Sequence, residues 1–111
     1  MNCCYKISLS LLVIIIMILN SCKKKDKVDC SIVTYSGTIS QIISGNCTNT
    51  GCHGASSSNG DFTTYAGLKT VADNGSLHTR VVSKKDMPPG GLSSENIQKI
   101  NCWIENGAPN N

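Results

Sequence analysis

The chain has 111 residues, of which 40% are hydrophobic and 5% aromatic, a length that suits one domain rather than two. The formal charge of +3 depends on a lysine cluster at residues 23–27, and no basic face interleaved with aromatic residues is visible, so nucleic-acid binding has no support. Large apolar side chains concentrate in the first twenty positions and are few in the rest of the chain. A domain this small usually needs a disulfide, a metal or a large buried cofactor for stability.

The N-terminal segment has the pattern of a bacterial export signal. Its apolar run, residues 7–19, is shorter than the ~18–20 apolar residues of a transmembrane helix. Leu19-Asn20-Ser21-Cys22 resembles a lipobox, at which the signal is cut before a cysteine that then carries lipid. We therefore expect a signal peptide over residues 1–21 and a tether over residues 22–34, with Cys22 anchoring the exported domain to a membrane facing the periplasm or the cell surface. An uncleaved signal anchor is the alternative.

Residues 35–111 are expected to form one all-α domain with three or more short helices. Isoleucines at i, i+3 and i+4 spacing predict a first helix over residues 38–44, which Gly45-Asn46 ends. A second helix is predicted over residues 63–71, whose apolar residues recur at the spacing of one helical face. Residues 77–83 are ambiguous and are consistent with a single helical turn.

The last helix is the most clearly marked element. Ser93 or Ser94 can accept backbone N–H groups at its start, and Glu95 in the first turn suits the helix dipole. Isoleucines at the spacing of one helical face follow, and Asn106-Gly107 marks the end. Long loops join the predicted helices, and such loops are unusual in a compact domain unless they wrap a ligand.

Cys47 and the pair Cys52-His53 form a candidate site for covalent haem c attachment. Two thiols add to the two vinyl groups of haem, and the histidine beside the second thiol binds the iron axially. The usual spacer between the cysteines has two residues, whereas this spacer has four. Gly51, directly before the second cysteine, makes an outward loop of the longer spacer easier. The motif therefore predicts haem thioethers at Cys47 and Cys52, and His53 as the proximal iron ligand.

Three other interpretations of this motif are open. A zinc site could use Cys47, Cys52, His53 and Cys102, but the neighbours Cys52 and His53 do not easily bind one tetrahedral ion. A Cys47–Cys52 disulfide is possible in an exported protein. A catalytic Cys-His pair needs a base placed across a cleft from the thiolate, which sequence neighbours do not provide. The adjacent Cys-His pair favours haem attachment over all three.

Met87 is the candidate for the distal iron ligand. A methionine thioether opposite histidine is the ligand pair of electron-transfer cytochromes c, and it raises the reduction potential. Met87 is the only methionine after the predicted signal peptide, and Pro88-Pro89 restricts its loop. His78 is the competitor and would give a bis-histidine site of lower potential. A lone histidine near Arg80 is more often a surface residue, so Met87 is favoured.

Cys30 and Cys102 are left once the signal peptide, the lipid and the haem account for the other cysteines. An even pair in an oxidising compartment predicts a disulfide. This bond would close a loop of about seventy residues and contribute ~4 kcal/mol of stability in the chain-entropy model. Two free thiols are the alternative, which export disfavours.

The stretch from Tyr35 to Asn111 resembles the small monohaem cytochrome c-like domains of lipoproteins from the Bacteroidetes and planctomycete lineages. The matching segments are Ser36–Ile39, Asn46–Gly54, Tyr65–Leu68, Met87–Gly91 and Trp103–Asn111. The resemblance implies a cytochrome c-like fold around a covalently bound haem, with crossing first and last helices and Trp103 packed near the haem. It also implies thioethers at Cys47 and Cys52, with His53 and Met87 as the axial ligands.

Together these features predict an exported, lipid-anchored monohaem c-type cytochrome that carries single electrons between transient redox protein partners and is not an enzyme. Two alternatives are open. One is a non-haem surface lipoprotein stapled by the disulfides Cys47–Cys52 and Cys30–Cys102. The other is a haem peroxidase-like domain, in which Met87 leaves the iron open to peroxide.

Overall fold

The computed structural model describes residues 27–111, and every regular element in this range is a helix. The all-α prediction is therefore confirmed for the described part of the chain. Within residues 27–111, no helix has both the length and the apolar character needed to cross a membrane. The expected signal peptide over residues 1–21 and the lipidated Cys22 lie outside the described residues, as does the beginning of the tether.

The first helical segment begins earlier and is longer than the sequence predicts. The short 3-10 helix η1 (Cys30–Ile32) precedes the π-helix η2 (Tyr35–Ile39), which continues directly into α2 (Ser40–Asn46). Gly45-Asn46 was expected to end the helix but forms the last residues of α2. The helix therefore continues up to Cys47, the first cysteine of the predicted haem-attachment motif at residues 47–53, called the attachment motif below.

The two helices after the attachment motif are α3 (Tyr65–Asp73) and η3 (His78–Ser83). α3 begins two residues after its predicted start, because the Thr64 hydroxyl accepts a hydrogen bond from a backbone N–H of the first turn and caps the helix there. The ambiguous stretch at residues 77–83 is helical and turns its apolar side chains into the core. Its buried residues are Leu77 and Val81.

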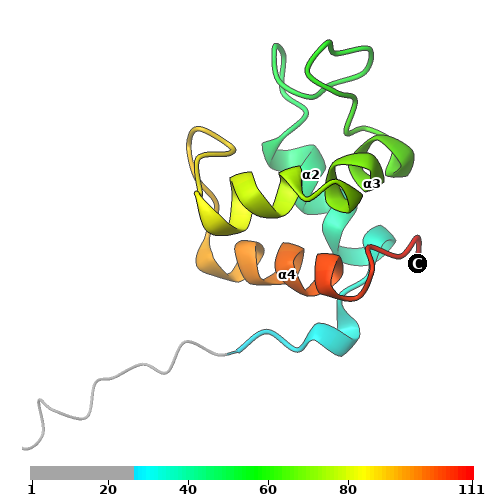
Figure 1. The fold of residues 1–111 in the computed structure, drawn as a ribbon, viewed down its shortest axis with the longest axis vertical. Coiled ribbons are helices and arrows are strands. Elements are labelled where there is room, and N and C mark those ends of the chain that lie inside the picture. The colour runs from blue at the N-terminus through cyan, green and yellow to red at the C-terminus, as the bar shows by residue number, and fades with distance from the viewer. Residues whose placement is uncertain (1–26) are drawn as a thin grey trace, which may run out of the picture.

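The last helix, α4 (Ser94–Glu105), agrees with the sequence prediction at both ends. Ser93 Oγ accepts a hydrogen bond from Asn96 N–H, and the helix ends before Asn106-Gly107. In Figure 1, α4 lies alongside η3, and the loop between α2 and α3 extends away from α4. The largest fully buried side chains come from η2, α2, α3 and α4: Ile39, Ile43, Leu68, Ile100 and Trp103.

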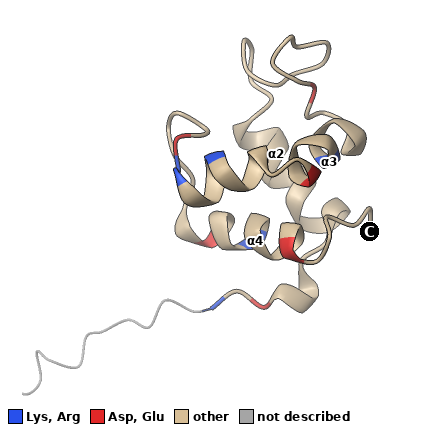
Figure 2. Cartoon of the chain, in the orientation of Figure 1, with Lys and Arg blue, Asp and Glu red and all other residues tan. Residues whose placement is uncertain are grey.

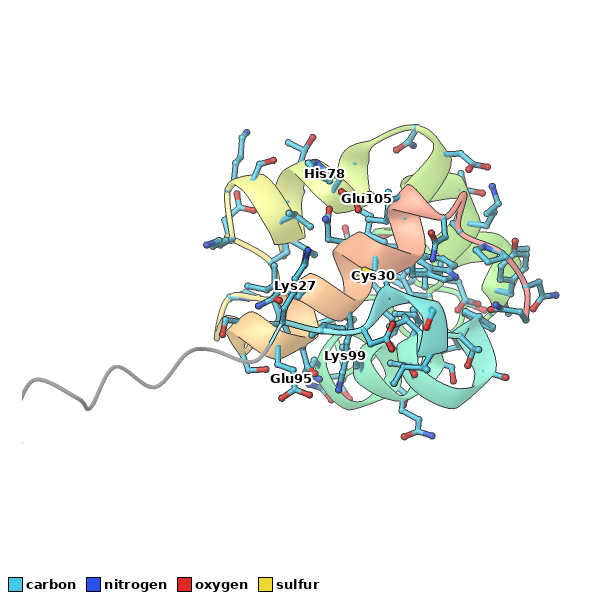
Figure 3. The ribbon with its side chains drawn as sticks, turned by 90° about the horizontal axis from the view of Figure 1, so that it is seen from below. Lys27, Cys30, His78, Glu95, Lys99 and Glu105 are labelled. Carbon is cyan, nitrogen blue, oxygen red and sulfur yellow. A yellow bond between two sulfur atoms is a disulfide. The ribbon has the colours of Figure 1, made fainter. Side chains whose placement is uncertain are left out.

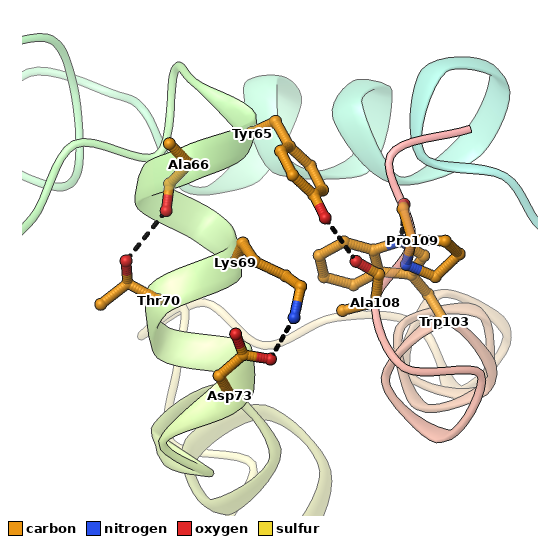
Figure 4. A network of polar contacts seen from close by, with 8 residues as sticks. All are labelled: Tyr65, Ala66, Lys69, Thr70, Asp73, Trp103, Ala108 and Pro109. Atoms are coloured by element: carbon orange, nitrogen blue, oxygen red, sulfur yellow. Dashed lines mark hydrogen bonds and ion pairs between the residues drawn. The ribbon is translucent and has the colours of Figure 1, made fainter.

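The C-terminal tail folds back beside α4 and α3 (Figure 4). Trp103 is fully buried, and its indole N–H donates to the carbonyl oxygen of Pro109 at 2.9 Å. The Tyr65 hydroxyl donates to the carbonyl oxygen of Ala108 at 2.8 Å. The Tyr35 ring contacts both aromatic rings, with centroids 5.0 Å from Tyr65 and 5.9 Å from Trp103. These contacts join the first, middle and last helical segments.

A disulfide bond joins Cys30 in η1 to Cys102 in α4, as the sequence predicts. Figure 3 shows Cys30 lying against α4. The two Cα atoms are 5.2 Å apart although the residues are 72 positions apart in sequence, and this Cα distance is ordinary for a disulfide. The bond fixes the start of the described chain to the last helix.

Gly67 in α3 is expected to be intolerant of any side chain. A Cβ at this position would lie 1.7 Å from the carbonyl oxygen of Asp61, so the backbone before α3 would have to move. We expect Gly67→Ala to lower the free energy of unfolding by about 1–3 kcal/mol, measured by chemical denaturation. Gly45→Ala in α2 is the matched control, because its Cβ meets nothing within 4 Å and alanine favours the helix by up to about 1 kcal/mol. Equal stabilities of the two variants would contradict this packing.

Candidate functional site

The attachment motif forms a closed loop at the end of α2. Cys47 is the C-terminal cap of α2, and His53 N–H donates back to the carbonyl oxygen of Cys47 at 2.9 Å. Inside the loop, Cys52 N–H donates to the carbonyl oxygen of Asn49 at 2.9 Å. Gly51 has φ 82°, in the left-handed region that favours glycine. The exposed middle of the four-residue spacer therefore forms a turn that points outward, with both cysteines and His53 at its base.

The His53 ring is held on two sides. Its Nδ1 lies 3.0 Å from the carbonyl oxygen of Asn59, which can only accept, so in the neutral ring Nδ1 carries the proton and Nε2 has the lone pair. The ring stacks on Phe62, with centroids 4.0 Å apart and planes 5° apart. Phe62 N–H also donates to the carbonyl oxygen of His53 at 2.9 Å. A metal-binding histidine is oriented in the same way, by an acceptor on its second ring nitrogen.

The two cysteines of the motif are free thiols, so the alternative Cys47–Cys52 disulfide is not formed in this structure. Burial and, to a smaller extent, the neighbouring Cys52 raise the pKa of Cys47 to about 11. The Cys47 thiol therefore stays protonated at neutral pH and reacts slowly with reagents from water.

Cys47, Cys52 and His53 line one cavity together with Met87. Met87 comes from the loop between η3 and α4, 34 residues after His53 in the sequence. The cavity volume is about 490 Å³, within the roughly 300–1,000 Å³ of small-molecule and cofactor sites. The rest of the wall is mainly apolar and includes Val71, Leu77, Val81, Pro88 and Pro89. The structure therefore brings the four predicted haem-site residues together.

Two other candidate residues lie outside the cavity wall. His78 is on η3 (Figure 3), where its Nδ1 lies 3.4 Å from Ser83 Oγ, and it is not among the residues that line the cavity. Trp103, which the family resemblance places near the haem, packs inside the protein core and does not line the cavity either. Its indole N–H is taken by the carbonyl oxygen of Pro109. Of the two candidate distal ligands, Met87 alone reaches the cavity.

Arg80 is the one charged residue in the wall of this cavity. Its Nε donates to Asp86 Oδ1 at 2.7 Å, and both side chains are nearly half exposed. This hydrogen bond is the largest cause that lowers the pKa of Asp86 from its ordinary value. Residues 48–60, on the other side of the site, include no Lys, Arg, Asp or Glu, and the next charged residue along the chain is Asp61, so the loop between α2 and α3 is tan for most of its length in Figure 2. Within the cavity wall, charge is therefore contributed from η3 alone.

The zinc hypothesis is not supported by the described residues. Within residues 27–111, no three His, Cys, Asp or Glu side chains are grouped in a way that could hold a metal ion. Cys102, the fourth ligand of that hypothesis, is bonded to Cys30 instead. Of the proposed zinc ligands, only Cys47, Cys52 and His53 line the cavity.

Three residues of the site were missed by sequence reasoning. His53 needs an acceptor for its second ring nitrogen, but this acceptor is the backbone carbonyl of Asn59, which no side-chain pattern shows. Phe62 is the only phenylalanine in the chain, and this is the one signal that could have drawn attention to it. Arg80 lies in the stretch whose helical character was ambiguous, so its position at the cavity was not predictable.

Comparison with known proteins gives no match: no family model, no curated protein and no solved structure is similar to the chain. The resemblance to cytochrome c-like lipoproteins therefore stays a prediction based on sequence motifs. Any function assigned to the chain rests on the geometry of the cavity and on the chemistry of the residues that line it.

Proposed function

We propose that the chain is a monohaem c-type cytochrome with a cytochrome c-like fold, which carries single electrons between transient protein partners. The observation that carries this proposal is the meeting of Cys47, Cys52, His53 and Met87 at one apolar cavity. Two thiols, one imidazole and one thioether are the protein groups that attach and ligate haem in electron-transfer cytochromes c. When bound, haem supplies a one-electron iron couple whose potential depends on its ligands and surroundings.

Each site residue has a definite task in this proposal. The Cys47 and Cys52 thiols would hold the haem through thioether bonds, which form when each thiol adds to a vinyl group. His53 offers the Nε2 lone pair, because its Nδ1–H is already bound to the carbonyl oxygen of Asn59. Met87 offers its sulfur from the loop before α4, and a thioether as the second axial ligand raises the reduction potential.

The cavity wall suits electron transfer better than catalysis. Val71, Leu77 and Val81 line it, and an apolar surrounding of this kind excludes water and tunes the potential of a redox centre. Because His53 and Met87 would both bind the iron, neither of the positions they take would be open to a substrate. For this reason we propose an electron carrier rather than a peroxidase-like enzyme.

Export and lipid anchoring are part of the proposal and rest on the sequence pattern that ends at Cys22. The Cys30–Cys102 disulfide supports export, because disulfides form and persist in oxidising compartments. The lipid on Cys22 would hold the domain at a membrane surface facing the periplasm or the cell exterior.

The absorption spectrum of the purified protein tests this proposal. The full chain is expressed in bacteria together with haem-ligation machinery. We expect the reduced protein to show c-type haem bands, and we expect the colour to stay with the polypeptide after denaturation, because the thioethers are covalent. Fully colourless protein would contradict haem binding.

The matched control is the double variant Cys47→Ser/Cys52→Ser. It keeps side chains of nearly the same size in the cavity wall but has no thiol to form a thioether. We expect this variant to retain no haem after denaturation. Equal retention by the variant and the wild type would show that these cysteines are not the attachment points.

A further inference from the structure

Arg80 contacts the loop that presents Met87 at three points. Its carbonyl oxygen accepts hydrogen bonds from Asp86 N–H at 3.0 Å and from Met87 N–H at 3.4 Å. Its Nε donates to Asp86 Oδ1 at 2.7 Å. The backbone and the side chain of one residue thus hold the two successive residues that lead into the Met-Pro-Pro segment.

The chain reverses direction just before these contacts. Lys85 has φ 56°, in the left-handed region, which is unfavourable for a residue with a side chain and persists where surrounding contacts impose it. The contacts of Arg80 with Asp86 follow directly after Lys85 and supply such a constraint. On the other side of Met87, Pro88-Pro89 has restricted φ angles. Met87 therefore lies between the hydrogen bonds to Arg80 on one side and the conformationally restricted Pro88-Pro89 segment on the other.

We propose that Arg80 is a positioning residue for Met87, and that the Arg80–Asp86 ion pair holds the loop so that Met87 stays in the cavity wall. The inference rests on the proposed function, because Met87 acts as an axial ligand only when haem is bound. Arg80 and Met87 line the same cavity, so the contacts between Arg80 and the Met87 loop are part of the site.

The other ion pairs of the described chain do not have this arrangement. Lys69–Asp73 and Lys99–Glu95 join residues four positions apart within one helix, on the surface of α3 and α4. Each of these pairs connects two turns of the same helix and fixes no loop. Breaking one of them is therefore a control for the general effect of losing a surface ion pair.

Asp86→Asn tests the positioning role, because it removes the carboxylate charge at almost unchanged size. In the haem-loaded full chain, we expect exogenous imidazole to bind the iron about two- to fivefold more tightly, the range of one partly exposed ion pair. We also expect the reduction potential to fall towards that of a protein without the methionine ligand. Asp86→Glu should restore both properties, and Glu95→Gln should leave both at the wild-type values.

A second readout requires no haem. In the haem-free full chain, we expect the backbone amide protons of Asp86 and Met87 to exchange with solvent faster in Asp86→Asn and at the wild-type rate in Glu95→Gln. Wild-type values of imidazole affinity, potential and amide exchange in Asp86→Asn would overturn the positioning role. A wild-type protein that takes up no haem would overturn the proposed function instead. The amide exchange rates would then still test whether the Arg80–Asp86 ion pair holds the loop.

Discussion

Met87→Ala is expected to lower the reduction potential of the haem-loaded protein by at least about 100 mV, within the roughly 0.8 V that axial ligands span. Alanine has no donor atom, so the stabilisation of the reduced iron by the thioether is lost. The vacated position should also bind exogenous imidazole more tightly than in the wild type. A redox titration followed by absorbance measures the potential, and an imidazole titration measures the accessibility of the iron.

His78→Ala is the matched control for Met87→Ala. His78 lies outside the cavity wall, beside Ser83 on η3, so its loss should leave the potential unchanged. A changed potential in His78→Ala and an unchanged one in Met87→Ala would make His78 the distal ligand. If the wild type already binds imidazole as tightly as Met87→Ala, the iron is open and the peroxidase-like alternative is favoured.

Removing the Cys30–Cys102 disulfide is expected to lower the free energy of unfolding by about 4 kcal/mol in the chain-entropy model. The bond closes a loop between residues 72 positions apart, and losing it gives the unfolded chain much more freedom. For a domain of this size, such a loss lowers the melting temperature by about 20 °C. The double variant Cys30→Ser/Cys102→Ser, followed by thermal and chemical denaturation, measures the effect.

Reductant provides the control for this stability experiment. Treating the wild type with a thiol reductant should reproduce the lower melting temperature, while the double variant should not respond. Cys102 is one of the buried residues of α4, so part of the effect in the variant comes from placing a serine hydroxyl in the core. A wild type whose melting temperature is insensitive to reductant would show that the bond does not stabilise the fold.

The last helix was predictable because its signals are local. Ser93 caps it, isoleucines recur on one face, and Asn106-Gly107 follows its last turn. The start of the first helical segment was not predictable for the opposite reason. η2 is held by the C-terminal residue: Tyr35 N–H donates to the Asn111 side chain at 2.8 Å and Ser36 N–H to its backbone at 2.9 Å. Contacts between residues so far apart in the sequence leave no trace in local periodicity.

The candidate site also contains residues that were predictable from the sequence and residues that were not. Cys47, Cys52 and His53 are close in sequence, so their spacing alone points to one site. Met87 could be identified by elimination, because it is the only methionine after the predicted signal peptide. The stack of Phe62 on His53 depends on how the loop between them folds back. In that loop, residues 54–60 form hydrogen-bonded turns, and Ser57 Oγ donates to the Cys52 carbonyl oxygen at 2.6 Å.

The intact mass of the purified chain tests haem attachment most directly. We predict a mass equal to the processed polypeptide and its lipid plus one haem, and we expect the added mass to persist after denaturation and acid extraction, which remove non-covalent haem. The Cys47→Ser/Cys52→Ser variant should lack this added mass. A wild-type mass without haem, with Cys47 and Cys52 found as thiols or as a disulfide, would contradict the assignment of this chain as a c-type cytochrome.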